Sequence, residues 1–142
     1  MVHALKEAAR VLSLEGCLID MRPLSIDVPL EVASPSGWQS AGPVDMSPGV
    51  PTDLVADNAV LQVVKEGIIK RVSLDRFESA YVWDTYEAMQ AYIEERWSPD
   101  VIVPPAVAER AQSLAASQPG GGPLRIRLVI QLGVYQRAPA LF

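Results

Sequence analysis

The 142-residue sequence is poor in the side chains that build disulfides, metal sites and catalytic triads. Cys17 is its only cysteine and His3 its only histidine. A single cysteine excludes an internal disulfide and fits a reducing compartment, so we expect a cytoplasmic protein. The two residues supply too few ligands for a zinc site within one chain, and His3 is the only histidine that could serve as the base of a nucleophilic triad. We therefore predict no metal site and assign no catalytic residue.

Long apolar runs and concentrated positive charge are also missing. No run of 18 apolar residues occurs, and Lys6, Glu7 and Arg10 interrupt the first segment, which argues against a membrane span or a signal peptide. The sequence has 12 basic and 17 acidic residues, a net charge of −5, and its longest basic run is Lys70-Arg71. Nucleic acid and anionic membranes bind basic faces, so neither is expected as a partner.

A glycine-rich phosphate loop is absent as well. Such a loop follows a strand and opens a helix. The glycine run Gly120-Gly121-Gly122 instead precedes a predicted strand, and we interpret residues 118–123 as a flexible connector. The sequence therefore predicts no nucleotide site of the Walker or G-x-G-x-x-G kind.

The apolar residues that are present suffice for a core. They make up 49% of the chain, and the length favours one domain over residues 1–142. Periodicity and capping signals predict a small α/β or α+β fold, with a mixed sheet of three or more strands and packed helices. The expected helices are 2–12, 52–69, 86–97 and 105–117, and the expected strands are 17–21, 77–83 and 124–135.

For two of these strands the sequence also predicts which faces are buried. The largely apolar strand 17–21 reads as buried on both faces, with Cys17 a buried side chain. Strand 124–135 alternates, which predicts one buried face. Arg125 and Arg127 share its other face, where they either bind an anion or pair with acidic residues. The expected buried face consists of Leu124, Ile126, Leu128, Ile130, Leu132 and Val134.

Segment 23–51 holds half of the twelve prolines. Within it, residues 30–33 and 38–41 flank the turn-rich Ser34-Pro35-Ser36-Gly37, which favours a short hairpin. An ordered loop is the alternative.

Aromatic and acidic residues offer candidate sites. Five of the nine aromatic residues fall within 17 positions and either line a pocket for a flat ligand or pack in the core. Asp53 with Asp57, or Glu94 with Asp20, are the carboxylate pairs considered for acid–base chemistry. Asp53 and Asp57 are better explained by the dipole at a helix start, and Glu94 by a solvated face. The aromatic residues are Tyr81, Trp83, Tyr86, Tyr92 and Trp97.

Residues 3–20, H-A-L-K-E-A-A-R-V-L-S-L-E-G-C-L-I-D, resemble the late helix, turn and fifth strand of class I S-adenosylmethionine-dependent methyltransferases. That family often has A-L-R-E-A-x-R-V-L-R-P-G-G-x-L-x here, and Leu14 and Glu15 replace its usual proline and first glycine. The later aromatic strand and the long terminal strand look like the family's sixth and seventh strands. The resemblance implies a truncated methyltransferase-like fold.

The same resemblance implies that the cofactor-binding half of the family's fold is missing from this sequence. The family holds its cofactor with a glycine-rich turn after the first strand and an acidic residue after the second, both upstream of the matched helix. We therefore expect no cofactor, unless a partner or a dimer supplies the S-adenosylmethionine site. Asp20 and Arg22 lie at the strand end where family sites open, and with Tyr81, Trp83 and Tyr86 they form the candidate ligand pocket.

An open apolar edge is a further expectation. The edge of the strand at 18–21 that would pair with the family's fourth strand has no such partner here, so a homodimer, another protein or the 30–41 hairpin would cover it. The leading hypothesis is a methyltransferase-like protein that is non-catalytic alone and acts through self-association or a protein partner. The alternatives are a subunit of a split methyltransferase and a protein that binds a small aromatic ligand.

Overall fold

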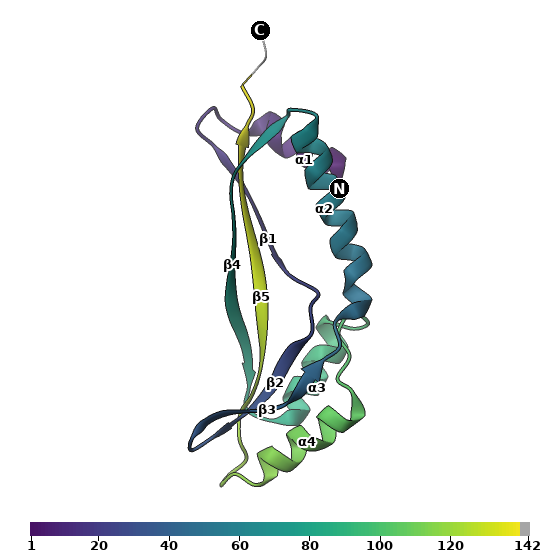
Figure 1. The fold of residues 1–142 in the computed structure, drawn as a ribbon, viewed down its shortest axis with the longest axis vertical. Helices are drawn as coiled ribbons and strands as arrows, with labels where there is room; N and C mark the ends of the chain where they lie inside the picture. The colour runs from purple at the N-terminus through teal and green to yellow at the C-terminus, as the bar shows by residue number, and fades with distance from the viewer. Residues whose placement is uncertain (140–142) are drawn as a thin grey trace. The chain divides into compact units, whose positions relative to one another are not determined.

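The computed structural model describes residues 1–139 and contains both helices and strands, as the sequence predicts (Figure 1). Within these residues five strands form one sheet and four α-helices accompany it, so the predicted small α+β fold is confirmed. The elements in chain order are α1 (Val2–Val11), β1 (Cys17–Pro23), β2 (Val28–Ser34), β3 (Gly37–Val44), the 3₁₀ helix η1 (Ser47–Gly49), α2 (Val50–Lys65), β4 (Ile69–Trp83), α3 (Tyr86–Arg96), α4 (Pro105–Ala116) and β5 (Leu124–Arg137).

The C-terminal strand β5 organises the sheet. It pairs with β4, with β1 and with β2, and β2 pairs in turn with β3. β1 lies antiparallel to β5 with Cys17 opposite Gln136, and β2 lies antiparallel to it with Leu30 opposite Ile126. Among the residues that the structure describes, β1 has no other strand partner, so one of its edges is unpaired.

Contacts group the chain into two compact units built from interleaved segments. The first unit comprises Met1–Leu24, Pro51–Phe77 and the chain from Ile130 onward, and the second comprises Ser25–Val50 and Glu78–Val129. Two of the four divisions fall within β4 and β5, where no change of composition marks a boundary. The glycine-rich segment 118–123, which we expected to be a connector, lies within the second unit.

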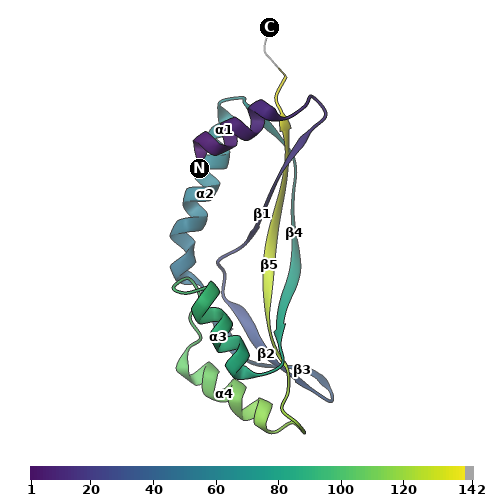
Figure 2. The same cartoon turned by 180° about the vertical axis from the view of Figure 1, so that it is seen from behind.

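The first unit contains α1 and α2 on the same side of β1 and β5 (Figures 1 and 2). The amphipathic patterns in the sequence explain this placement, because the apolar stripes of both helices need a surface to pack on. Lys6 on α1 also contacts Glu66, which follows α2, with 2.6 Å between Nζ and Oε2. The buried cluster consists of Ala9, Val60, Val63, Ile69 and Tyr135.

The second unit contains the hairpin of β2 and β3. Its turn is fixed by the Ser34 hydroxyl, which donates to the Gly37 carbonyl at 2.7 Å. Helix α4 packs on both strands, and Thr85 caps α3 by accepting a hydrogen bond from the Ala88 amide. The core residues include Leu30, Val32, Val44, Met89, Leu124 and Ile126.

The prediction that β1 is buried on both faces is wrong, and so is the prediction that Cys17 is buried. Exposed and half-buried residues alternate along the strand, and the Cys17 thiol is exposed. Ile19 and Met21 on the same face are 61% and 62% exposed. The reason is that α1 and α2 cover only the opposite face of this part of the sheet, to which Leu18 points.

The alternation predicted for β5 is present, but the prediction that one face is buried along the whole strand is wrong. Leu124, Ile126 and Leu128 are buried, whereas further along the strand the odd-numbered residues Gln131, Gly133 and Tyr135 take their place. Tyr135 packs against Val60 and Val63 of α2, so the odd-numbered side chains are the covered ones in that part of the strand. The switch leaves Ile130, Leu132 and Val134 half-buried.

Candidate functional site

The residues of the predicted pocket belong to both units. Asp20 and Arg22 lie on β1 in the first unit, and Tyr81, Trp83 and Tyr86 lie in the second. The chemistry available in each unit is therefore described separately.

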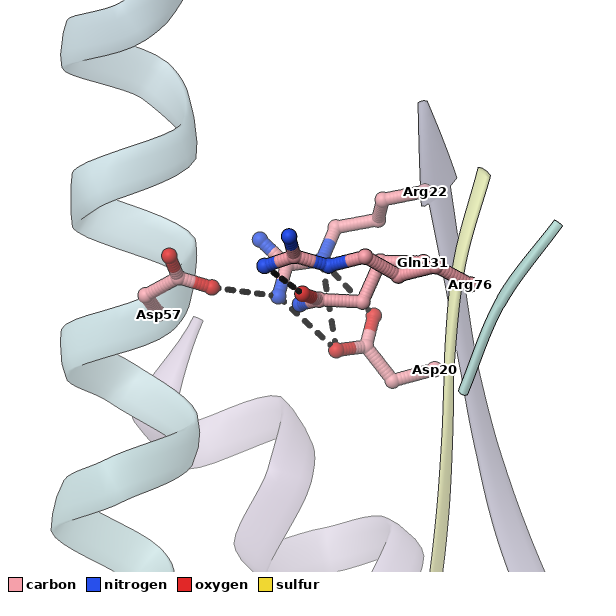
Figure 3. Close-up of polar contacts among 5 residues, drawn as sticks. All are labelled: Asp20, Arg22, Asp57, Arg76 and Gln131. Carbon is pink, nitrogen blue, oxygen red and sulfur yellow. Dashed lines mark hydrogen bonds and ion pairs between the residues drawn. The ribbon is translucent and has the colours of Figure 1, made fainter. Parts of the chain in front are cut away.

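Asp20 and Arg22 form an ion-pair network with Asp57 of α2 (Figure 3). Because the two β1 residues are two positions apart, they share the face that points toward α2. Arg22 donates from Nε and Nη2 to the Asp20 carboxylate, each at 2.9 Å, and from Nη2 to Asp57 Oδ1 at 2.7 Å. Burial acts to lower the pKa of Arg22, but the hydrogen bonds with Asp20 and Asp57 outweigh it, and the pKa is raised. Two carboxylates thus hold one permanent cation between sheet and helix.

Two residues that the sequence did not single out form a separate contact beside this network (Figure 3). Arg76 of β4 donates from Nη2 to Gln131 Oε1 of β5 at 3.5 Å, and Gln131 is buried. Buried Tyr135 lies on the same strand, and desolvation raises the pKa of its phenol, with the Asp20 charge adding to the effect. A glutamine within an apolar strand is the one signal that marks this position. Since Asp20 and Asp57 both bind Arg22, the network offers structural ion pairs rather than a free base.

The aromatic residues of the second unit pack on one another. Tyr81, Trp83, Tyr92 and Trp97 make six ring contacts with centroids 4.9 to 6.0 Å apart. Helix α3 follows the end of β4 and brings the ring of Tyr92 within 5.8 Å of the rings of both Tyr81 and Trp83. Edge-to-face geometry is a stable aromatic arrangement by itself. It favours mutual packing over an open slot for a flat ligand.

Tyr86 stands apart from the four rings and lines a cleft of about 240 Å³ between α3 and the segment that follows it. Met89 and Ile93 form its apolar floor. Glu94 at the rim accepts a hydrogen bond from Gln90 at 3.0 Å. The cleft therefore brings together Tyr86 and Glu94, but neither Tyr81 nor Trp83 of the predicted pocket lines it.

Arg125 and Arg127 pair with an acidic residue, the second of the two alternatives that the sequence left open. Glu31 of β2 accepts from Arg125 Nε at 2.6 Å and lies 3.1 Å from Arg127 Nε. The Arg125 guanidinium also stacks 4.2 Å from the centre of the Trp38 ring. Glu31 is only 7% exposed, so the two cations neutralise a buried carboxylate. Both guanidinium groups therefore have an acidic partner within the fold.

Two strand-to-helix connections within the described residues can be compared with the glycine-rich turn that holds the cofactor in the methyltransferase family. A phosphate- or adenosine-binding turn needs open backbone at a strand-to-helix connection. Between β3 and α2, a Cβ added at Gly49 would meet Ser25 Oγ at 2.5 Å, so its own chain fills that space. Between β4 and α3, Asp84 and Thr85 contribute no glycine. Neither of these two connections therefore has an open glycine turn.

Residues 1–139 contain neither a cluster of metal ligands nor a membrane-spanning helix. No group of three or more His, Cys, Asp and Glu side chains is placed to hold a metal ion. None of the helices in this range is long and apolar enough to cross a membrane.

The unpaired edge of β1 is the remaining candidate. Its residues pair with β5 on one side only, and Cys17, Ile19 and Met21 are exposed on the face away from α2. An unpaired strand with apolar side chains is a template for pairing with another strand.

The chain matches no protein-family model, no curated protein and no solved structure.

Proposed function

We propose that the protein acts by self-association, with β1 as the binding element, and that it is non-catalytic alone. The observation that carries this proposal is the unpaired edge of β1 beside the exposed Ile19 and Met21. A strand added at this edge gains main-chain hydrogen bonds and buries both side chains. The acidic and basic groups near β1 are engaged with one another, which leaves association as the activity that this face supports best.

The resemblance to class I methyltransferases enters the same proposal. By this resemblance, β1 corresponds to the family's fifth strand, and β4 and β5 correspond to its sixth and seventh strands. The open edge of β1 is then the edge that pairs with the fourth strand in a complete enzyme. We place the protein in the cytoplasm, where an exposed thiol such as Cys17 stays reduced.

Sedimentation of the purified protein tests the association. The wild-type chain is expected to sediment as a species larger than a 15.4 kDa monomer. Met21→Asp places an unpaired charge on the associating face and is expected to shift the protein to monomer. Leu61→Asp is the matched control, because Leu61 is 58% exposed on α2 in the same unit and lies outside β1.

Two outcomes would overturn the proposal: a wild-type protein that stays monomeric at every concentration, or equal loss of association in Leu61→Asp and Met21→Asp. Circular dichroism of both variants establishes that each remains folded.

Calorimetric titration with S-adenosylmethionine and S-adenosylhomocysteine separates this proposal from the split-methyltransferase alternative. We expect no heat of binding, because Ser25 fills the space at Gly49 and the other strand-to-helix connection lacks glycine. Micromolar binding by the associated protein would favour a methyltransferase site completed by a second chain.

A further inference from the structure

We propose that the associated form is a closed dimer in which β1 pairs antiparallel with the partner's β1 about a twofold axis at Met21. This inference rests on the proposed function and specifies its geometry. In this arrangement Met21 faces the partner's Met21, Asp20 faces the partner's Arg22, and Ile19 faces the partner's Pro23. The sheet then continues from one copy into the other.

Symmetry favours the antiparallel arrangement. Copies related by a twofold axis present the same patch to each other, and identical edge strands related by such an axis perpendicular to the sheet run in opposite directions. One dimer consumes both open β1 edges, so assembly closes at two copies.

The alternating exposure of β1 limits the possible registers. Cys17, Ile19 and Met21 form the exposed face, whereas Asp20 and Arg22 point toward α2. Residues directly opposite in an antiparallel pair share a face, and a shift of one residue moves every side chain to the other side. Registers that keep the exposed apolar side chains together therefore pair odd-numbered residues with odd ones, and the axis passes through a residue.

Charge selects among the residues that can lie on the axis. An axis at Asp20 opposes two carboxylates, and an axis at Arg22 opposes two guanidinium groups, and both arrangements are destabilising. An axis at Ile19 leaves Arg22 opposite the partner's Gly16. The axis at Met21 places each Asp20 opposite an Arg22 and makes two complementary pairs.

The contacts already present support the Met21 axis. The Asp20 carboxylate and the Arg22 guanidinium are held in fixed orientations by their mutual hydrogen bonds and by Asp57. Preorganised charges of this kind fix register and partner choice more than affinity. The apolar contribution comes from the exposed Met21 and Ile19, which gain contact with Met21 and Pro23 of the partner subunit.

The open edge of β4 does not offer the same site. That strand carries Lys70, Arg71, Asp75, Arg76 and Glu78 within nine residues. Charged side chains along an edge are a common protection against strand addition. The exposed face of β1 bears no charged side chain, and we therefore assign the dimer contact to β1.

Cysteine cross-linking tests the register. In a Cys17→Ser background, Met21→Cys is expected to oxidise almost completely to a disulfide-linked dimer, because directly opposed Cβ atoms lie about 4.5 to 5.5 Å apart. Ile19→Cys in the same background is the matched control. Ile19 is as exposed as Met21 on the same face, but its two copies are offset by four residues on paired strands, about 13 Å, and should not cross-link.

A second measurement is independent of the Met21 substitution. Ile19→Cys and Pro23→Cys proteins, each in the Cys17→Ser background, are expected to cross-link when mixed, because Ile19 opposes the partner's Pro23. Neither protein should cross-link alone. This result supports the register even if Met21→Cys does not fold.

The possible outcomes distinguish this inference from the proposed function. If the protein sediments as a dimer but Ile19→Cys cross-links in place of Met21→Cys, or if no pair cross-links, the Met21 axis is overturned and self-association stands. An oligomer larger than two copies also overturns the closed dimer alone. If the wild-type chain is monomeric, both proposals fail.

Discussion

Glu31 is the shared carboxylate partner of two arginines in the second unit. It is almost fully buried on β2 and binds both Arg125 and Arg127 of β5. Its removal leaves Arg125 without a carboxylate partner and Arg127 with only the exposed Glu78. Arg125 keeps its contact with the Trp38 ring, which cannot replace a carboxylate.

Glu31→Gln is expected to lower the free energy of unfolding by about 2 kcal/mol, because one amide oxygen replaces a charged acceptor shared by two arginines. Urea unfolding measures the loss. Glu78→Gln is the control, since Glu78 contacts the same Arg127 at 3.4 Å but is largely exposed, and it should change stability by less than about 0.5 kcal/mol. Equal effects would show that burial of Glu31 does not matter.

Tyr135 gives the stability of the protein a dependence on alkaline pH. The pKa of its phenol is raised in the folded state, first because burial disfavours the charged form. The unfolded chain releases this proton near its ordinary value of about 10, whereas the folded chain retains it. The stabilisation is therefore complete below about pH 10 and is lost as the pH rises toward the folded-state pKa.

Tyr135→Phe is expected to reduce this loss. Urea unfolding at several pH values between 8 and 11, values chosen about the ordinary tyrosine pKa, should show a smaller decrease of the unfolding free energy for the phenylalanine variant than for the wild-type protein. If the unfolding free energies of the two proteins decrease equally with pH, the burial of a protonated phenol is contradicted.

At the scale of elements, the contact between β3 and α4 depends on the absence of a side chain at Gly42. Its φ is +136°, and a Cβ there would lie 2.7 Å from Val107 Cγ2. Gly37 in the same strand also has a positive φ, +117°, but a Cβ there would meet nothing within 4 Å. Substitutions at these two glycines therefore distinguish the cost of backbone strain from the cost of a steric clash.

Gly42→Ala is expected to destabilise the protein by about 3 kcal/mol, the sum of positive-φ strain and overpacking, and Gly37→Ala by about 1 kcal/mol from strain alone. Thermal or urea unfolding measures both. Adding Val107→Ala to Gly42→Ala should recover part of the loss. If the double variant is less stable than the sum of the single variants, the clash with α4 is not the cause.

The sequence predicts most elements, because their signals are local. The Thr85 cap marks the start of α3, and the periodicity of 124–135 marks β5. β4 begins at Ile69 rather than Phe77. Segment 70–76, which has four charged residues, carries little strand propensity and is held by pairing with β5. Ile69 itself belongs to the buried cluster and not to the end of the preceding helix.

The candidate site was less predictable than the elements. Position alone identifies Asp20 and Arg22, but their partner Asp57 lies 35 residues beyond Arg22, where the sequence favours a helix-dipole role. Arg76 and Gln131 come together only through the pairing of β4 with β5. Local patterns contain no information about such long-range contacts.

At the scale of the whole molecule, association couples thermal stability to protein concentration. A ligand that binds only the folded state stabilises it by mass action, and in a dimer each copy is the ligand of the other. The melting temperature is therefore expected to rise by about 2 °C for each tenfold increase in concentration.

Differential scanning calorimetry over a hundredfold concentration range measures this rise. Met21→Asp should melt at one temperature throughout, and Leu61→Asp should follow the wild-type protein. A wild-type melting temperature that does not change with concentration would mean that folding is complete without the second copy.

The change of buried side within β5 has a consequence for how this strand tolerates variation. In a saturation mutagenesis experiment scored by protein abundance, the even-numbered positions up to Leu128 should reject polar residues. From Gln131 the pattern should invert, with Gly133 and Tyr135 intolerant and Leu132 and Val134 permissive. A single strand would thus display two substitution patterns in opposite phase, with the reversal between Leu128 and Gln131.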